Sequence, residues 1–449
     1  MSTLHDRLSD LADAAPTGAP TGAAPGDLWV SGRRLDRRRR LGTAVAVATA
    51  AALVGGLAGL SWSRSDVDVQ PAGPRTELGF PDRFYLPSER LPGTDDTGPI
   101  GPLSALLSGH ERPIGISATG EYAFLDLPTR ADRTFVGDVG GPAINADGTK
   151  VAYWREGRPS GEPLGDGYDS IVGVNVYDTV SGDVVTFPVP TEHGLQDQAL
   201  VWAGDTLWFE VWQNDAPRDD GSASGSLQET VAWNPADDSR TTWDRGLPGL
   251  SLWSASAWDG RLVGLGGQGA LRFFTHEGTE VRAEVDMSPR VDPHVVVSDD
   301  GRRLAALEDT DGPSVTDTLP QPLLVGELPD RAGTTPAVAP QQVPGTADQG
   351  VNEVLGWRDD SHVVAMRYGN GADRQAALVS VDVETGEQEL LAPLTTNTPE
   401  LSADALEGPL LDAPPPPDPL DPRLVYGGIA AILLGCTVAL VWWRRRVQR

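Results

Sequence analysis

Short apolar runs separated by polar turns recur along most of this chain. From residue 112 to residue 395, runs rich in β-branched and aromatic residues alternate with Gly, Asp and Pro, and no helical periodicity persists. One recurring unit is a hairpin with a tight polar turn, found at 114–127, 174–187, 230–243, 271–285, 323–338 and 379–391. A second unit places a strongly apolar strand after an acidic or glycine turn, and is found at 143–154, 201–209, 257–265, 295–307 and 354–366.

The two units alternate, so that each period supplies four strands. The turn glycines Gly120 and Gly386 lie five periods apart, which gives a period of about 53 residues, typical of propeller blades. A four-stranded blade has two apolar faces and must stack between neighbours. We therefore predict an all-β domain, a six-bladed β-propeller whose first inner hairpin comes from 84–107. Seven blades are the alternative, if residues 80–110 form a blade of their own.

Two longer apolar segments flank this domain, at 41–62 and 424–443. Each has about the twenty residues that a helix needs to cross a membrane. Arginines precede the first segment and follow the second, which predicts that both termini are cytoplasmic and that residues 63–423 are extracytoplasmic. A cleaved signal peptide is the alternative for the first segment, but forty residues precede it, where a signal peptide has only a short basic lead.

The predicted organisation follows from these segments. In chain order it comprises a disordered basic cytosolic lead (1–40), a transmembrane helix (41–62), a linker with the first propeller strands (63–111), the propeller repeats (112–395), a Pro-rich stalk (396–423), a second transmembrane helix (424–443) and a basic cytosolic tail (444–449).

Charge and cysteine content exclude one class of partner and one means of stabilising the domain. The chain has a formal net charge of -29, and residues 63–423 alone hold 24 basic and 59 acidic side chains. An acidic domain of this kind repels nucleic acid, so we expect no nucleic-acid partner. The one cysteine, Cys436, falls in the second apolar segment, so the external domain has no disulfide to stabilise it.

Two turns carry a resemblance to a known family. The turns at 145–148 (Asn-Ala-Asp-Gly) and 298–301 (Ser-Asp-Asp-Gly) resemble the Ser-Pro-Asp-Gly turn of TolB-type, WD40-like propellers, although the proline is missing. With its two anchors and Arg-rich lead, the chain is similar to the membrane-anchored WD40-like propeller proteins of actinobacteria. Its Trp-Asp pairs, at 243–244 and 258–259, do not recur in register. The resemblance implies a fold more than an activity.

No catalytic motif is present. The segment 221–225 (Gly-Ser-Ala-Ser-Gly) misses the nucleophile elbow, because Ala223 occupies the serine position. The external histidines are scattered, at 110, 193, 276, 294 and 362. We therefore predict a protein that is not an enzyme. A polysaccharide hydrolase that uses two inward carboxylates stays open as an alternative.

Most carboxylates are interpreted as turn residues. We predict no cofactor and no metal site, with Ca²⁺ at 309–312 or 215–221 as the alternative, since neither segment supplies a full calcium loop.

The tryptophans suggest one ligand platform. Trp208 and Trp212 share a strand face with Glu210, an arrangement that suits a sugar or a peptide. Core filling is the alternative, because both faces of a propeller blade pack against neighbours.

The two apolar segments also suggest a helix contact. Small residues recur every four positions in both segments, at Gly55 and Gly59 and at Gly427, Ala431 and Gly435, a spacing that lets helices approach closely.

These patterns favour a membrane-integrated binding, scaffold or sensor module for a protein, peptide or glycan outside the cell. One alternative is a regulator of an envelope-stress sigma factor. Its cytosolic partner would dock on Leu4, Leu8, Leu11 and Trp29, where the three leucines have helical spacing.

Overall fold

The computed structural model describes residues 78–415 with internal gaps and, near the C-terminus, residues 435, 437 and 441–446. The gaps are 86–90, 108–111, 132–139, 164–169, 216–223, 289, 310–319, 330–336, 348, 369–375, 395–397 and 413–414. The chain divides into two parts, Met1–Gln70 and Pro71–Arg449, and every element below belongs to the second part.

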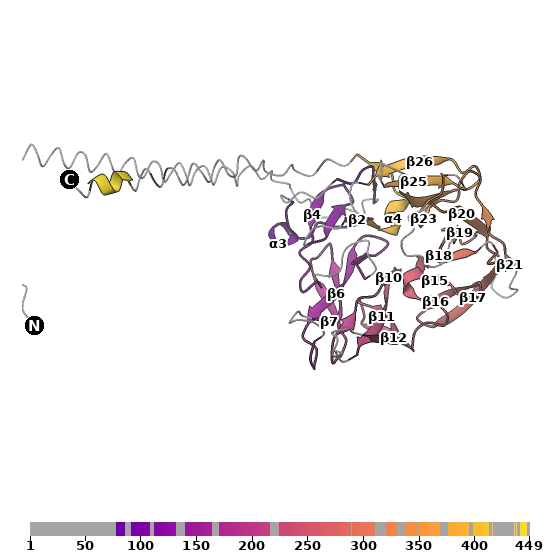
Figure 1. Ribbon diagram of the computed structural model, residues 1–449, viewed down its shortest axis with the longest axis horizontal. Helices are drawn as coiled ribbons and strands as arrows, with labels where there is room; N and C mark the ends of the chain where they lie inside the picture. The colour runs from indigo at the N-terminus through magenta and orange to yellow at the C-terminus, as the bar shows by residue number, and fades with distance from the viewer. Residues whose placement is uncertain are drawn as a thin grey trace, which may run out of the picture. The chain divides into compact units, whose positions relative to one another are not determined.

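The described residues form mostly short strands, which we group into six four-stranded antiparallel units, I to VI (Figure 1). Unit I contains β27 (Glu400–Leu401), β2 (Leu103–Leu107), β3 (Ile114–Ser117) and β4 (Tyr122–Phe124). Unit II contains β5 (Ala143–Ile144), β6 (Lys150–Gly157), β7 (Ser170–Asp178) and β8 (Val184–Pro188). Unit III contains β10 (Leu200–Ala203), β11 (Thr206–Asn214), β12 (Gly225–Asn234) and β13 (Ser239–Asp244).

The remaining three units follow the same order of strands along the chain. Unit IV contains β14 (Ser256–Trp258), β15 (Arg261–Leu265), β16 (Ala270–Thr275) and β17 (Gly278–Val285). Unit V contains β18 (Val291–Val297), β19 (Arg303–Glu308), β20 (Leu323–Glu327) and β22 (Gln341–Gln342). Unit VI contains β23 (Glu353–Asp359), β24 (His362–Arg367), β25 (Ala377–Asp382) and β26 (Gln388–Pro393).

Two short strands connect or extend these units. β9 (Leu195–Gln196) pairs with both β7 and β11 and so joins units II and III into one nine-stranded sheet. β21 (Ala337–Val338) adds to unit IV as a fifth strand, parallel to β17. The second strand of the hairpin predicted at 323–338 therefore does not pair with β20. Its place beside β20 is taken by β22, so this part of the prediction is wrong.

Apolar clusters fill every junction between consecutive units. The six clusters lie between units I and II, II and III, III and IV, IV and V, V and VI, and VI and I. Alternation along each strand sends neighbouring side chains to opposite junctions: on β18, Val295 faces unit IV and Val296 faces unit VI. Because the sixth cluster joins the last unit to the first, the units form a closed, propeller-type ring.

Buried tryptophans add hydrogen bonds across these junctions. The indole Nε1 of Trp154 donates to the carbonyl of Gln198 at 2.9 Å, and that of Trp202 donates to Ala143 at 3.2 Å. Trp357 of unit VI donates to Val296 of unit V at 3.3 Å. These bonds satisfy the indole N–H groups inside the apolar core and fix the spacing of adjacent sheets.

The ring is closed by the C-terminal end of the domain. β27 pairs antiparallel with β2, with Leu106 opposite Glu400, and Ser402 Oγ donates to the carbonyl of Ser104 at 3.2 Å. The prediction of an inner hairpin drawn entirely from 84–107 is therefore wrong, because β27 supplies the inner strand of unit I. β1 (Phe80–Pro81) and β28 (Leu410–Leu411) also pair, in parallel, so the two ends of the domain lie side by side.

The folded part extends beyond the predicted repeats. The range 396–423, predicted as a stalk, contains β27, the short helix α4 (Ala403–Leu406) and β28. The other short helices are α3 (Thr94–Thr97) and the 3₁₀ turn η1 (Leu252–Ser254). Residues 80–110 contribute β1, α3 and β2, and the residues described there form no separate four-stranded sheet.

The two predicted membrane segments are mostly outside the described residues. Segment 41–62 is outside them entirely, whereas residues 435, 437 and 441–443 of the second segment are helical. The Arg446 guanidinium lies over the ring of Trp442, 4.0 Å from its centroid. Within the described part of the chain, no helix has both the length and the apolar character needed to cross a membrane.

Candidate functional site

The first strand of each unit lies nearest the axis of the ring. These strands stand at the edge of their sheets, and successive pairs contact one another: β27 and β5, β5 and β10, β10 and β14, β14 and β18, and β18 and β23. Helix α4 completes the circle, because it contacts both β23 and β2. Side chains at the beginning of these strands therefore gather at one end of the axis.

Four titratable side chains occupy that position, and we call them the axial cluster: Asp292, His294, Glu353 and Glu400. Asp292 and His294 belong to β18, Glu353 begins β23, and Glu400 begins β27. All four side chains are half-buried, so protein surrounds them but solvent still reaches them. The fold thus brings together residues that are more than one hundred positions apart in the sequence.

Burial disfavours the charged form of both glutamates in the axial cluster. Burial, and to a smaller extent the nearby charge of Glu353, raise the pKa of Glu400 to about 8. Burial also raises the pKa of Glu353, with a contribution from Asp292 that the charge of His294 opposes. At neutral pH, Glu400 therefore retains its proton, which is typical of carboxyl groups at functional sites.

His294 connects the cluster to the next unit. Its Nε2 lies 3.2 Å from the carbonyl oxygen of Val354, so this nitrogen carries the hydrogen and donates it to β23. The sequence offered no reason to separate His294 from the other scattered histidines. Its position beside Glu353 depends on the contact between β18 and β23, which no local motif encodes.

Several other acids lie in the turns that follow the first strands, where they accept hydrogen bonds from the backbone. Asp147 Oδ1 accepts from the Thr149 N–H at 3.0 Å, and Asp300 Oδ1 accepts from the Arg302 N–H at 2.9 Å. Asp359 Oδ1 likewise accepts from the Ser361 N–H at 2.8 Å. The structure therefore supports the interpretation of these carboxylates as turn residues.

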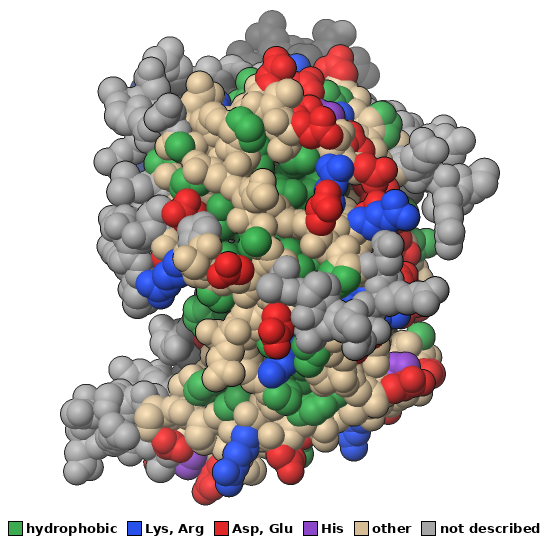
Figure 2. Space-filling view, turned by 90° about the vertical axis from the view of Figure 1, so that its right-hand side faces the viewer, with side chains coloured by type: hydrophobic (Ala, Val, Ile, Leu, Met, Phe, Trp, Pro, Cys, Tyr) green, Lys and Arg blue, Asp and Glu red, His purple; other side chains and the backbone are tan. Residues whose placement is uncertain are grey.

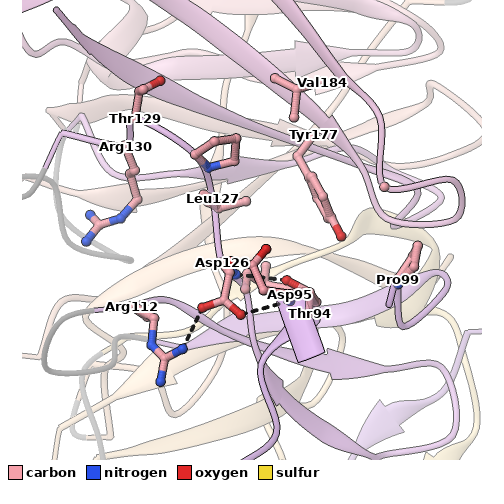
Figure 3. A pocket seen from close by; sticks show the side chains of 13 residues that line it. Thr94, Asp95, Pro99, Arg112, Asp126, Leu127, Thr129, Arg130, Tyr177 and Val184 are labelled. Carbon is pink, nitrogen blue, oxygen red and sulfur yellow. Dashed lines mark hydrogen bonds and ion pairs between the residues drawn. The ribbon is translucent and has the colours of Figure 1, made fainter. Parts of the chain in front are cut away.

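A cleft of about 650 Å³ lies between units I and II (Figure 3). Its polar groups are largely engaged with one another. Arg112 Nη1 pairs with Asp126 Oδ1 at 2.5 Å, and the guanidinium lies 4.2 Å from the ring centroid of Phe124. Asp126 Oδ2 also accepts from the Asp95 N–H at 3.0 Å, while its own N–H donates to Thr94 at 2.9 Å. The cleft has the size of a ligand pocket, but Arg112 and Asp126 within it are already paired with each other.

The surface carries acids in many places. Figure 2 shows acidic side chains spread over the viewed face and interspersed with basic ones. Ion pairs such as Lys150 with Asp205, at 3.1 Å, and Arg261 with Glu280, at 3.4 Å, balance some of them. The axial cluster differs from these sites because, among the described residues, no ion pair joins either of its glutamates to an arginine or a lysine.

The predicted tryptophan platform lies at the junction of units III and IV. Trp208 is 1% exposed and Glu210 is 3% exposed, while Trp212 is half-buried. Trp208 stacks on Trp243, with ring centroids 5.0 Å apart, and packs in the apolar cluster of that junction. This burial supports the alternative of core filling. Trp212 Nε1 donates to Glu210 Oε2 at 2.9 Å.

Replacing Trp212 with phenylalanine tests that hydrogen bond. The substitution leaves the buried Glu210 carboxylate without its indole donor, so we expect the free energy of unfolding to fall by about 2 kcal/mol, the usual cost of a lost bond to a charged group. Trp253→Phe is the matched control, because it removes the bond from Nε1 to Gln198 Oε1, 2.7 Å long, at a ring that is 56% exposed. Urea unfolding of both variants measures the difference. Equal losses would contradict the role of burial.

The other predicted site residues lie mostly outside the described residues. These are Leu4, Leu8, Leu11, Trp29, Gly55, Gly59, Gly427 and Ala431. Gly435 is helical and exposed. The two possible calcium segments are also largely outside. Among the described residues, no group of three or more acidic, histidine or cysteine side chains has the geometry of a metal site.

Comparison with known proteins finds no matching family model and no curated protein that resembles the sequence. Solved structures do resemble the fold. The tricorn protease shares 12% identity at a TM-score of 0.39, over 72% of this chain and 31% of that one, so this chain spans less than a third of its length.

Two smaller proteins are similar over most of their own length. The β-propeller domain of the Trilobed protease from Pyrococcus furiosus has 12% identity and a TM-score of 0.34, over 64% of this chain and 79% of that one. An oligogalacturonate lyase from Vibrio parahaemolyticus has 11% identity and a TM-score of 0.38, over 71% and 80%. At this level the likeness concerns the arrangement of strands alone, and the site must be judged from its own residues.

Proposed function

We propose that this chain is a membrane-anchored, six-bladed β-propeller, similar to the WD40-like proteins of actinobacteria, that binds a protein, peptide or glycan outside the cell. Units I to VI are the six blades. The apolar segments 41–62 and 424–443 are the anchors, and their flanking arginines place both termini in the cytoplasm. The pairing of β1 with β28 supports this topology, because it brings both ends of the domain to one place.

The axial cluster is the observation that carries the binding function. Glu353 and Glu400 are half-buried carboxyl groups with raised pKa values, and they are brought together by strands from different blades. Grouping such residues costs stability, since burial disfavours their charged forms. A fold that retains them at its axis, rather than filling the same space with apolar side chains, is best explained by a ligand that contacts them.

Ligand capture by the full-length chain tests the proposal. We expect the purified protein, in detergent, to retain a saturable ligand from envelope extracts, and the double variant Glu353→Gln/Glu400→Gln to lose most of it. The control Glu387→Gln/Glu389→Gln makes the same change in charge at exposed positions of unit VI and should bind normally. Undiminished capture by the axial variant would reject the axial cluster as the binding site.

The same residues favour one alternative, a polysaccharide hydrolase. Glu400, which is protonated at neutral pH, suits a general acid, and Glu353 suits a base or nucleophile. Release of new reducing ends from a polysaccharide, abolished in Glu400→Gln, would support hydrolysis. The role as a sigma-factor regulator rests on residues 1–40, outside the described part of the chain, and remains a prediction.

A further inference from the structure

We infer that the cleft between units I and II binds an uncharged carbohydrate, with one sugar ring lying among Arg112, Asp126 and Val184. This inference goes beyond the function proposed above, because it adds a second binding site. The cleft lies beside β4 and β8, the outermost strands of their units, whereas the axial cluster lies on the innermost strands. The inference follows from the shape of the cleft, its polar groups and a strained turn at its edge.

The cleft combines an apolar floor with a polar rim (Figure 3). Leu125, Leu127 and Tyr177 form the floor, and each is at most 9% exposed. Val184 and Pro99, which are half-buried, continue the apolar surface to the edge of the cleft. The volume of about 650 Å³ falls within the range of small-molecule sites. An apolar floor beside polar groups matches a sugar ring, which has a C–H face and hydroxyl groups around its edge.

The polar rim is preorganised by its own contacts. Arg112 Nη1 pairs with Asp126 Oδ1 at 2.5 Å, and the guanidinium lies over the ring of Phe124. The other oxygen of Asp126 accepts from the Asp95 N–H at 3.0 Å. A ligand therefore meets groups whose orientation is already fixed, which lowers the entropy lost on binding.

The pairing of Arg112 with Asp126 favours hydroxyl groups over ions as the ligand. Two opposite charges in contact largely cancel, so a free anion or cation gains little from either. The pair still offers hydrogen bonds: among the described residues, Arg112 bonds only through Nη1, and its side chain is 45% exposed. A sugar hydroxyl can accept from a guanidinium N–H and donate to a carboxylate oxygen. Hydrogen bonds to charged groups of this kind are the stronger ones.

The edge of the cleft contains an unfavourable backbone conformation at Thr129. Its φ is 52°, and among the described non-glycine residues with positive φ it alone is β-branched. Such a conformation is rare for a branched side chain. Buried groups maintain it: Asn175 Nδ2 donates to Thr129 Oγ1 at 3.3 Å, and the Tyr153 hydroxyl donates to the Pro128 carbonyl at 3.1 Å. Strain that the surrounding structure maintains is common at ligand sites, and here it shapes the rim of the cleft.

Oligosaccharides and their methylated twins test the inference on the full-length protein, in a detergent that contains no sugar. The probes are fluorescent oligosaccharides of glucose, galactose, mannose and xylose, each with a twin whose hydroxyl groups are all methylated. We expect at least one sugar to bind at least about tenfold more tightly than its twin, since a site built for hydroxyl groups rejects an analogue that lacks them. Its affinity should change less than about twofold between about 0.05 M and about 0.5 M salt, because the ligand has no charge.

Two neighbouring valines of β8 locate the site. Val184→Trp fills the cleft without changing Arg112 or Asp126, and should weaken the sugar at least about tenfold through steric exclusion. Val185→Trp is the matched control. It makes the same change at the next residue, which faces the other side of the sheet and is 43% exposed, so binding should change less than about twofold.

A second pair of variants tests the polar rim and decides the question if Val184→Trp fails to fold. Arg112→Met removes the guanidinium and should weaken the sugar at least about tenfold. The control Arg83→Met removes an arginine of similar exposure that pairs with Asp82 at 2.9 Å, outside the cleft, and should bind the sugar normally.

The outcomes separate this inference from the proposed function. Equal binding of every sugar and its twin, or equal losses in Val184→Trp and Val185→Trp, would overturn the inference. Loss of the sugar in Glu353→Gln/Glu400→Gln with normal binding by Val184→Trp would also overturn it, and would place the sugar at the axial cluster instead. If the cleft variants lose the sugar but still capture the ligand from envelope extracts, the two sites are distinct and both stand.

Discussion

Replacing Gly148 with alanine is expected to lower the free energy of unfolding by about 3 kcal/mol or more. Gly148 ends the turn between β5 and β6, with φ of 69°, a conformation that costs a residue with a side chain about 1 kcal/mol. A β-carbon there would also overlap the carbonyl oxygen of Leu103 in unit I. The two backbones cannot separate freely, because Leu103 N–H donates to the Gly148 carbonyl at 2.9 Å.

Gly260→Ala is the control for this prediction. Gly260 occupies the equivalent turn between β14 and β15 with φ of 71°, but no atom lies within 4 Å of the added β-carbon. The Gly260→Ala substitution should therefore lower the free energy of unfolding only by the conformational cost of the positive φ, about 1 kcal/mol. Urea unfolding followed by tryptophan fluorescence measures both variants. If the two losses were equal, close packing at the junction of units I and II would not be the cause.

The substitution Glu400→Gln is expected to stabilise the protein in mildly alkaline solution. The pKa of Glu400 is raised to about 8 in the folded state, from 4.5. The folded protein therefore holds a proton that the unfolded chain has lost, so stability falls as the pH rises from about 4.5 to about 8. A glutamine at this position stays neutral at every pH, so the variant does not lose stability in this way. Because the side chain is half-buried, we expect a gain of about 2 kcal/mol at pH 9.

Unfolding free energies of Glu400→Gln and the wild type across pH 5 to 9 measure this effect. The two curves should nearly coincide at pH 5 and separate as the pH rises. Glu389→Gln, at an exposed position of β26, serves as the control and should follow the wild type. A constant offset between Glu400→Gln and the wild type from pH 5 to 9 would show that folding does not raise the pKa of this carboxyl group.

The sequence predicted the strands whose signals are local. Alternation of apolar residues and a turn centred on glycine or aspartate located the hairpins of β7 with β8 and of β25 with β26. β27 escaped prediction because it has two residues, too few for any periodicity, and its partner β2 lies almost three hundred positions earlier. β21 escaped for a similar reason, since its two residues pair across to a different unit.

The axial cluster could not be predicted because its members are isolated in the sequence. Glu353 and Glu400 each begin a first strand, and nothing near them marks a site. The sequence suggested a ligand platform at Trp208, Glu210 and Trp212, because these residues alternate on one strand. The same alternation directs Trp208 and Glu210 into the junction between units III and IV. In a ring of stacked sheets, period-two patterns mark packing faces, whereas sites arise where different strands converge.

The parallel pairing of β1 with β28 has a mechanical consequence. The Phe80 N–H donates to the Pro409 carbonyl at 2.9 Å, and the Asp82 N–H donates to Leu411 at 3.1 Å. Tension that draws the chain before Phe80 and the chain after Leu411 in opposite directions runs along both strands. It loads these bonds together in shear instead of breaking them one by one. The pair of β1 and β28 would thus resist a force on the ends of the domain before that force reached β27 and opened the ring.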